Sequence, residues 1–207
     1  MTDGISSRHI NNAVEHFASL PGIGRKTALR FALHLLKLDN EEVHAFGEAL
    51  MDMRDSVKYC DECHNITESD ICDICSNPKR KSEHVCVVQD IRDVIAIENT
   101  QSFYGKYHVL GGVISPMDGI GPNDLQIDSL VMKSSKGEIK EIILALPATM
   151  EGDTTNFYIY KKLKAFEVKV TTIAKGVSIG DDIQYADKLT LGRSIQNRTL
   201  FDQSLSI

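Results

Sequence analysis

Four cysteines within sixteen residues are the feature that most constrains how this chain can fold. They form two C-x2-C pairs with eight residues between them, at Cys60, Cys63, Cys72 and Cys75. Each pair can aim two thiolates at one point, and two pairs complete the tetrahedral four-sulfur site that Zn²⁺ favours. The intervening residues are mostly polar and cannot build a core, so the metal would supply the folding energy of this module. We predict one structural Zn²⁺ per chain and no catalytic Zn²⁺, because four thiolates leave no open position.

The rest of the chain favours a metal over disulfides for these cysteines. No apolar run approaches the roughly 20 residues that a membrane span needs, and the first dozen residues lack the apolar core of a signal peptide. We therefore expect a cytoplasmic protein with no membrane contact, where disulfides are uncommon. His64 could compete as a ligand, but four cysteines suffice, and we expect it to be a surface imidazole. Cys86 stands in an apolar run and is expected to be a buried small side chain.

A glycine-containing turn lies upstream of the cysteines. The run Leu-Pro-Gly-Ile-Gly, from Leu20 to Gly24, separates two segments that carry apolar residues at helical spacing. The proline stops the first helix, and both Gly22 and Gly24 can take positive φ. The second helix would open on Arg25 and Lys26, where unpaired N–H groups and the positive end of the helix dipole point outward. A phosphate group fits at such a position.

The segment from Ser19 to Leu38 carries four cations and no acid. Three of them (Lys26, Arg30 and Lys37) fall on one side of the second helix, opposite its apolar set. Such a stripe can follow a phosphate backbone without reading bases. An ordinary helical hairpin with a solvated basic face has the same spacing, so the spacing alone leaves both interpretations open. Because the formal charge of the chain is −6, any DNA contact must be local and salt-sensitive.

Two segments flank the cysteine module. Residues 40–58 place apolar side chains at helical spacing and predict a third helix that returns toward the hairpin. Residues 77–81 carry three cations. We interpret them as a solvated linker, with a DNA contact as the alternative.

The second half of the chain alternates β-branched runs with helical segments. We expect four strands, over 84–89, 107–110, 141–146 and 168–173. Between them we expect three helices. One covers 91–100, one begins after a capping Asp124, and one runs from about 154 to 163. Strands that alternate with helices imply a parallel sheet covered on both faces.

Sites in such sheets gather at the carboxyl ends of the strands. Gln89 and Asp90 end the first expected strand, and Glu151-Gly152-Asp153 follows the third. Paired acids of this kind can hold Mg²⁺ for phosphoryl chemistry. Acids at a helix start are also common without any metal, because the helix dipole favours them. From the residues alone, the helix-start interpretation is favoured.

Taken together, these stretches resemble one family, the bacterial recombination mediator RecR. The order of parts is similar: a helix-hairpin-helix, a four-cysteine zinc module, a Toprim-like domain and a C-terminal segment. The segments most similar in sequence to the family are YHVL at 107–110, ISPMDGIGP at 114–122, IILA at 142–145, TMEGD at 149–153, YAD at 185–187 and TL at 190–191. The resemblance covers about residues 14 to 200.

The resemblance implies a multidomain α/β protein with four parts. These are a helix-hairpin-helix DNA-binding domain (1–56), a zinc-finger module (57–78), a Toprim domain with a parallel sheet (79–175) and a short C-terminal oligomerisation segment (176–207). It further implies a non-enzymatic DNA-repair function. RecR-like proteins form ring-shaped homo-oligomers, here expected to be a tetramer, that clamp DNA without sequence preference. With RecO or RecF they help to load the RecA recombinase onto gapped DNA coated by single-strand-binding protein.

The resemblance also assigns roles to single residues. Lys26 and Arg30 match the DNA-contacting cations of the family, and the four cysteines match its zinc ligands. Glu151 and Asp153 match the Toprim acids, which serve partner docking in this family. We extend the expected DNA surface to the rest of the hairpin, which adds Gly22, Gly24, Arg25 and Lys37. Residues 174–191 match the part implicated in subunit exchange and ring assembly.

Several residues depart from the family pattern. Toprim enzymes usually carry glutamate where this chain has Gln89, and an amide cannot act as a general base or an anionic metal ligand. Asp90 is no simple substitute, because neighbouring strand residues face opposite sides. Pro147, Ser178 and Asp181 also differ from the usual residues, which bears on partner docking and ring stability.

Two other functions compete with a non-enzymatic mediator. One is a Mg²⁺-dependent Toprim nuclease that uses Glu151 and Asp153. The other is a zinc-stapled assembly protein that contacts only protein.

Overall fold

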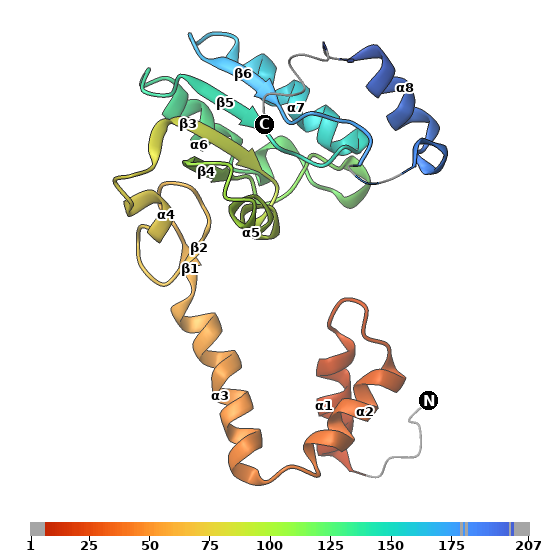
Figure 1. Ribbon diagram of the computed structural model, residues 1–207. Coiled ribbons are helices and arrows are strands. Elements are labelled where there is room, and N and C mark those ends of the chain that lie inside the picture. The colour runs from red at the N-terminus through yellow and green to blue at the C-terminus, as the bar shows by residue number, and fades with distance from the viewer. Residues whose placement is uncertain (1–6, 179, 181, 199, 201–207) are drawn as a thin grey trace. The chain divides into compact units, whose positions relative to one another are not determined.

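The computed structural model describes residues 7–178, 180, 182–198 and 200 (Figure 1). The chain divides into two compact units, and the boundary lies between Val57 and Lys58. The first unit is helical, and it contains α1 (Arg8–Ala18), α2 (Arg25–Leu35) and α3 (Asn40–Ser56). The second unit contains the cysteine module, a four-stranded sheet and a C-terminal helix. Asp181, one of the departures from the family pattern, lies outside the described residues.

The first two helices form the predicted helix-hairpin-helix. Val14 of α1 packs against Ala28 and Ala32 of α2, and the small alanines let the two helices approach closely. Gly22 takes a left-handed conformation with φ of 77°, which a residue with a Cβ adopts only at a cost. Gly24 does not use this freedom: its φ is −81°, and it is the extended N-cap residue of α2.

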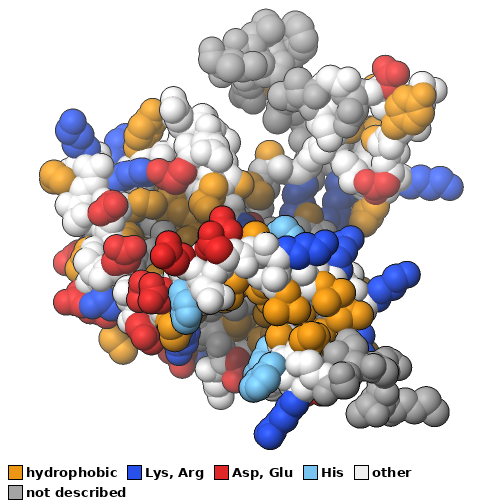
Figure 2. Space-filling view, turned by 90° about the horizontal axis from the view of Figure 1, so that it is seen from below, with side chains coloured by type: hydrophobic (Ala, Val, Ile, Leu, Met, Phe, Trp, Pro, Cys, Tyr) orange, Lys and Arg blue, Asp and Glu red, His pale blue; other side chains and the backbone are white. Residues whose placement is uncertain are grey.

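Helix α3 is the expected third helix, but its return toward the hairpin is limited to its first turn. Asn40, Val43 and His44 line a groove of about 320 Å³ together with residues of α1 and α2. No residue of α3 is buried. The side chains of Phe46, Leu50 and Met53 therefore stay exposed. Figure 2 shows one face of the protein, on which hydrophobic side chains lie beside Lys and Arg.

The cysteine module is built from short elements. Strands β1 (Lys58–Tyr59) and β2 (Ile66–Thr67) pair antiparallel, and α4 (Asp73–Ser76) follows. Neither the two-stranded β1–β2 hairpin nor the single turn of α4 could fold alone. The cysteines supply the interior of this module, since all four are buried with Ile71 and Ile74 packed against them.

The sheet is parallel, as predicted. Its order is β4-β3-β5-β6, with β3 (Lys81–Val88), β4 (Gly105–Val109), β5 (Glu141–Leu144) and β6 (Lys169–Thr172). The helices are α5 (Ile91–Asn99), α6 (Ile127–Ser134) and α7 (Met150–Leu163), followed by α8 (Lys188–Gln196). Three short 3-10 turns complete the described elements, at Pro116–Asp118, Pro122–Asp124 and Ile183–Tyr185.

Helices cover both faces of the sheet. Successive residues of β3 point to opposite faces, so its apolar side chains enter two different cores. Val85 and Val87 face a core that includes Ile127 of α6 and Ile159 of α7. Cys86 faces the other way, into a core with Val88, Tyr107, Val109 and Val94 of α5. Cys86 is thus the buried small side chain that the sequence predicts. Figure 1 shows α5 apart from α6 and α7, across the sheet.

Two helix starts differ from the sequence predictions. Helix α7 begins at Met150 rather than near 154, because the Thr149 hydroxyl accepts a hydrogen bond from the Gly152 amide at 3.2 Å and caps it. Asp124 does not cap α6, whose N-cap residue is Gln126. The Asp124 carboxylate instead accepts a hydrogen bond from the Gly121 amide at 2.8 Å. Among the described residues, no helix is long and apolar enough to span a membrane.

Candidate metal centre and nucleic-acid interface

The four cysteines of the 57–78 module converge on one point. Their sulfur atoms all lie within 4.8 Å of one another, and all four residues are buried. The Sγ atoms of Cys63 and Cys72 are 3.5 Å apart, close to the separation of about 3.8 Å that two ligands have in a tetrahedral zinc–sulfur site. The Cys72 amide donates to the Cys60 sulfur at 3.3 Å, which is the backbone support typical of such knuckles. The donor set and its geometry therefore fit one Zn²⁺.

The thiols influence one another strongly in this cluster. Hydrogen bonding from the Cys75 thiol lowers the pKa of Cys63 to about 6. Burial raises the pKa of Cys72 to about 11, and the pKa of Cys75 is raised because its proton is shared with the Cys63 sulfur. Hydrogen bonds within the protein therefore stabilise the Cys63 thiolate, whereas a bound dication stabilises all four thiolates.

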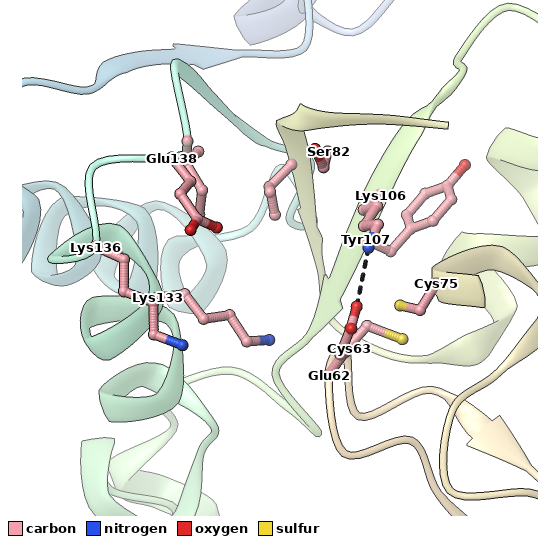
Figure 3. A pocket seen from close by; sticks show the side chains of 11 residues that line it. Glu62, Cys63, Cys75, Ser82, Lys106, Tyr107, Lys133, Lys136 and Glu138 are labelled. Atoms are coloured by element: carbon pink, nitrogen blue, oxygen red, sulfur yellow. Dashed lines mark hydrogen bonds and ion pairs between the residues drawn. The ribbon is translucent and has the colours of Figure 1, made fainter. Parts of the chain in front are cut away.

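Two lysines lie beside the cluster. A pocket of about 220 Å³ is lined by Cys63, Cys75 and Lys106 on one side and by Lys133 on the other (Figure 3). The Lys106 ammonium is 3.0 Å from the carboxylate of Glu62. Burial lowers the pKa of Lys133, although the nearby thiolates counteract this effect. A zinc ion with four thiolates carries a net charge of −2, which these two cations offset in part, because Lys106 is also paired with Glu62.

The module is bonded to the sheet through its first cysteine pair. The Val109 amide at the end of β4 donates to the Cys63 carbonyl at 2.8 Å. His64 shares a hydrogen bond of 2.8 Å with the hydroxyl of Ser129 on α6, and its ring meets that of His108 edge-on at 5.2 Å. The expectation that His64 is a surface imidazole is therefore wrong. Nothing near His64 in the sequence indicates a partner 65 residues away.

His108 is the most deeply buried ionisable residue of this network, with no exposed surface. Its Nε2 lies 2.7 Å from the Gln126 carbonyl, so Nε2 carries the proton and donates it. Its Nδ1 then accepts from the Lys133 ammonium at 3.2 Å. Burial lowers the pKa of His108 to about 3, and the Lys133 charge acts in the same direction. His108 is therefore neutral at physiological pH.

The cations of the hairpin form the second candidate site. Lys26, Arg30 and Lys37 line a shallow groove of about 380 Å³ along α2, together with Leu29, Leu33 and His34. Lys37 reaches this groove although α2 ends at Leu35. Arg25 and Lys26 occupy the first turn, where Gly24 offers no side-chain cap to the helix N–H groups. The predicted stripe thus exists as one face, with Gly22, Gly24 and Arg25 at its turn end.

The expected acids of the sheet edge lie in the first turns or at the N-caps of two helices. Glu151 is exposed in the first turn of α7, and Asp153 forms an ion pair with Lys175 at 2.5 Å. Asp90 is the N-cap residue of α5, where it pairs with Arg92. Gln89 is half-buried at the end of β3. The interpretation of Glu151 and Asp153 as acids at a helix start, favoured from the sequence, is confirmed.

The fold and the metal centre define a class: multidomain zinc-binding α/β proteins that begin with a helix-hairpin-helix. Known families match each part in the same order. The matches are the RecR helix-hairpin-helix at 10–54, the RecR four-cysteine zinc finger domain at 57–77, the Toprim domain at 83–174 and the RecR C-terminal region at 176–199. The resemblance found from the sequence is thereby confirmed.

Curated relatives agree over nearly the full chain. The recombination protein RecR of Bacteroides thetaiotaomicron is 60% identical over 192 residues, which cover 93% of this chain and 94% of the relative. That of Parabacteroides distasonis is 58% identical over 206 residues, covering 100% and 99%. That of Flavobacterium johnsoniae is 53% identical over 199 residues, covering 96% and 97%. The chain belongs to the RecR family of recombination proteins.

Proposed function

We propose that this protein is a non-enzymatic, DNA-binding mediator of recombination in DNA repair. It acts in the cytoplasm and binds DNA without sequence preference through the face of α2. With RecO or RecF it helps to load RecA onto gapped DNA. The observation that carries the proposal is the groove that Lys26, Arg30 and Lys37 share at the hairpin of a RecR-family chain.

The chemistry of the hairpin supports phosphate binding. Gly22 turns the chain so that α2 can begin at Arg25 with its first amides free of a side-chain cap. These amides and the helix dipole attract a phosphate oxygen, and Lys26 and Arg30 add full charges one turn apart. None of these groups reads a base edge, so the contact would be independent of sequence.

One hairpin makes few phosphate contacts and should bind weakly, so we propose that the protein is a homo-oligomer, a ring-shaped tetramer. The exposed face of α3 supports self-association. Val43, Phe46, Leu50, Met53 and Val57 are spaced by three and four residues in alternation, which is the pattern of a helix that packs on another helix. Phe46, Leu50 and Met53 are between 45% and 57% exposed in the single chain. Identical hairpins in one ring would add their weak contacts.

Light scattering tests this assembly. The parent chain should have the mass of a tetramer, and Leu50→Ser combined with Met53→Ser should reduce it. Met51→Ser is the matched control, because Met51 is as exposed, at 59%, but lies off the stripe. A monomeric parent, or a double variant with unchanged mass, would contradict the proposed role of α3.

The other parts receive proposed roles in the same scheme. We propose that residues 1–56 bind DNA, 57–78 form the zinc finger, 79–175 form the Toprim domain and 176–207 close the oligomer. The acids Glu151 and Asp153 would lie on the surface that docks RecO or RecF. Of the remaining departures from the family pattern, Pro147 lies after β5, beside this surface, and Ser178 lies in the C-terminal segment.

A loading assay tests the function. RecA filaments are allowed to form on gapped DNA coated with single-strand-binding protein, with and without this protein and a RecO or RecF partner. The proposal predicts faster loading only when the protein and a partner are both present. No acceleration with either partner would contradict it. Mg²⁺-dependent DNA cleavage that Asp153→Asn abolishes would replace it with the nuclease alternative.

A further inference from the structure

Asp153 is held from two sides by the C-terminal part of the chain. Its Oδ1 is 2.5 Å from the ammonium of Lys175, which follows β6. Its Oδ2 is 3.7 Å from a guanidinium nitrogen of Arg193, on α8. The Lys175 side chain is only 25% exposed. Both oxygens of this acid thus face a cation that the protein itself supplies.

These contacts lie where a ligand of such a sheet would bind. A pocket of about 650 Å³ opens at the carboxyl ends of the strands, between residues 145–148 after β5, residues 173–176 after β6, and α8. The chain order reverses between β3 and β5, which is the usual position of a site in an open parallel sheet. Lys175 and Arg193 both line this pocket.

Most donors at this edge are not free to bind a divalent ion. Asp93 and Asp187, which line the pocket, accept hydrogen bonds from the backbone amides of Gln89 and Leu189. The Toprim family implies Mg²⁺ held by acids at the strand ends, yet Gln89 offers a neutral amide in place of a carboxylate. Asp90 is occupied by the α5 N-terminus and by Arg92. Asp153 would have to exchange two cationic partners for the metal, and Glu151 is exposed to solvent. Mg²⁺ binds through oxygen atoms that are free to coordinate it.

We propose that Lys175 and Arg193 take the place of a divalent ion at Asp153, and that these ion pairs hold the C-terminal segment on the Toprim domain. The Lys175 ammonium, at 2.5 Å, donates a charge-assisted hydrogen bond that offsets the negative charge of the Asp153 carboxylate. It also repels a second cation from the same oxygen. The segment that carries the family's C-terminal match is therefore attached to the Toprim domain by charge. This proposal does not depend on DNA binding or on the RecO and RecF partners.

The test compares metal binding in five full-length zinc-loaded proteins, with Mn²⁺ as the probe and electron paramagnetic resonance as the readout. They are the parent, Asp153→Asn, the double variant Lys175→Ala with Arg193→Ala, the same double variant with Asp153→Asn added, and the control Lys188→Ala. Lys188 is exposed on α8 and has no ion pair among the described residues. The parent, Asp153→Asn and the control should bind Mn²⁺ equally weakly. The double variant should bind at least tenfold more tightly, and adding Asp153→Asn should remove that gain.

Limited chymotrypsin digestion gives a second readout, since Tyr185 is 79% exposed in the C-terminal segment. The double variant and Asp153→Asn should be cleaved there several-fold faster than the parent and the control. Parent-like thermal unfolding of the sheet would show that the variants fold. Tight Mn²⁺ binding by the parent that Asp153→Asn removes would overturn the proposal. So would a double variant that gains no Mn²⁺ affinity and is cleaved at the parent rate.

Discussion

The Val109 amide donates a hydrogen bond of 2.8 Å to the carbonyl of Cys63, so a zinc ligand is bonded directly to the last residue of strand β4. The Lys106–Glu62 ion pair and the His64–Ser129 hydrogen bond reinforce the same junction. The zinc module is therefore continuous with the edge of the parallel sheet. Loss of the metal should therefore weaken the end of β4 as well as the module itself.

Zinc removal should expose the Val109 amide. Metal analysis should first find about one zinc per chain, as four thiolates in one site require. After chelation the cysteine loop loses the metal that orders it, so the Cys63 carbonyl no longer holds the Val109 amide. Hydrogen exchange at Val109 should accelerate by at least tenfold, whereas exchange at Ala28, in the separate core of α1 and α2, should stay unchanged. Equal protection of Val109 with and without zinc would contradict this account.

Replacement of His108 should change how stability depends on pH. The pKa of His108 is lowered to about 3 in the folded protein by burial, and it is near 6.5 in the unfolded chain. Below pH 6.5 the unfolded state therefore binds a proton that the folded state does not. The contribution of this residue is complete above pH 6.5 and is lost as the pH falls toward 3, at up to about 1.4 kcal/mol per pH unit.

The His108→Gln variant retains an amide that can donate to the Gln126 carbonyl but does not titrate. Urea unfolding between pH 5 and 7 should show a flatter pH dependence for this variant than for the parent. His44→Gln, at an exposed position of α3, should keep the parent slope. Thiolate protonation contributes equally to all three proteins and cancels in the comparison. Parallel slopes for the parent and His108→Gln would show that His108 is not the titrating group.

Truncation of Arg80 should destabilise the second unit. Its guanidinium pairs with Glu98 and donates to the Gly105 carbonyl at 3.4 Å, with 15% of the side chain exposed. Tyr107 donates to the same carboxylate at 2.7 Å, and the hydrogen bond from Arg80 is the main reason that the pKa of Glu98 is lowered. Arg80→Ala should cost about 1–3 kcal/mol, because it leaves this carboxylate without its cation. Lys79→Ala, at an exposed neighbour, should change stability by less than about 0.5 kcal/mol.

A side chain at position 152 should not fit. A Cβ on Gly152 would lie 2.0 Å from the Pro147 carbonyl oxygen, and this backbone atom cannot move aside easily. Gly152→Ala should therefore cost more than about 2 kcal/mol in chemical denaturation. At Gly192 of α8 nothing lies within 4 Å of the added Cβ, so Gly192→Ala should be neutral or should stabilise by up to about 1 kcal/mol. Equal effects at the two glycines would contradict the described packing of α7 against the β5 loop.

The parts of the fold that sequence predicts well depend on short-range patterns. The spacing of Cys60 and Cys63 from Cys72 and Cys75 predicts the metal centre, because all the ligands lie within one short segment. The hairpin at Gly22 and the alternation of strands and helices are equally local. The parallel sheet then follows from short connections that admit few arrangements.

The errors concern residues whose partners are distant in the sequence. His64 bonds to Ser129, and Arg80, within the segment interpreted as a solvated linker, pairs with Glu98. Asp153 lies at a helix start as predicted, but no local pattern indicates its ion pair with Lys175, which forms because the chain returns to the same sheet edge after β6. The early start of α7 is a different kind of error. Thr149 is a favourable N-cap residue, and the acids after it suit a first helical turn, so a local signal was present.

Salt-dependent DNA binding by the full-length protein tests whether the face of α2 holds DNA, as proposed. Affinity for gapped and duplex DNA is measured by anisotropy at several salt concentrations for the parent, for Lys26→Ala with Arg30→Ala, and for Lys161→Ala with Lys164→Ala. The third protein is the matched control, because it loses two exposed cations at the C-terminal end of α7. If Lys26 and Arg30 each contact a phosphate, the hairpin variant should bind more weakly. Its negative slope of log affinity against log salt should become shallower by about 1.8. A hairpin variant with the parent affinity and slope would show that the face of α2 does not hold DNA.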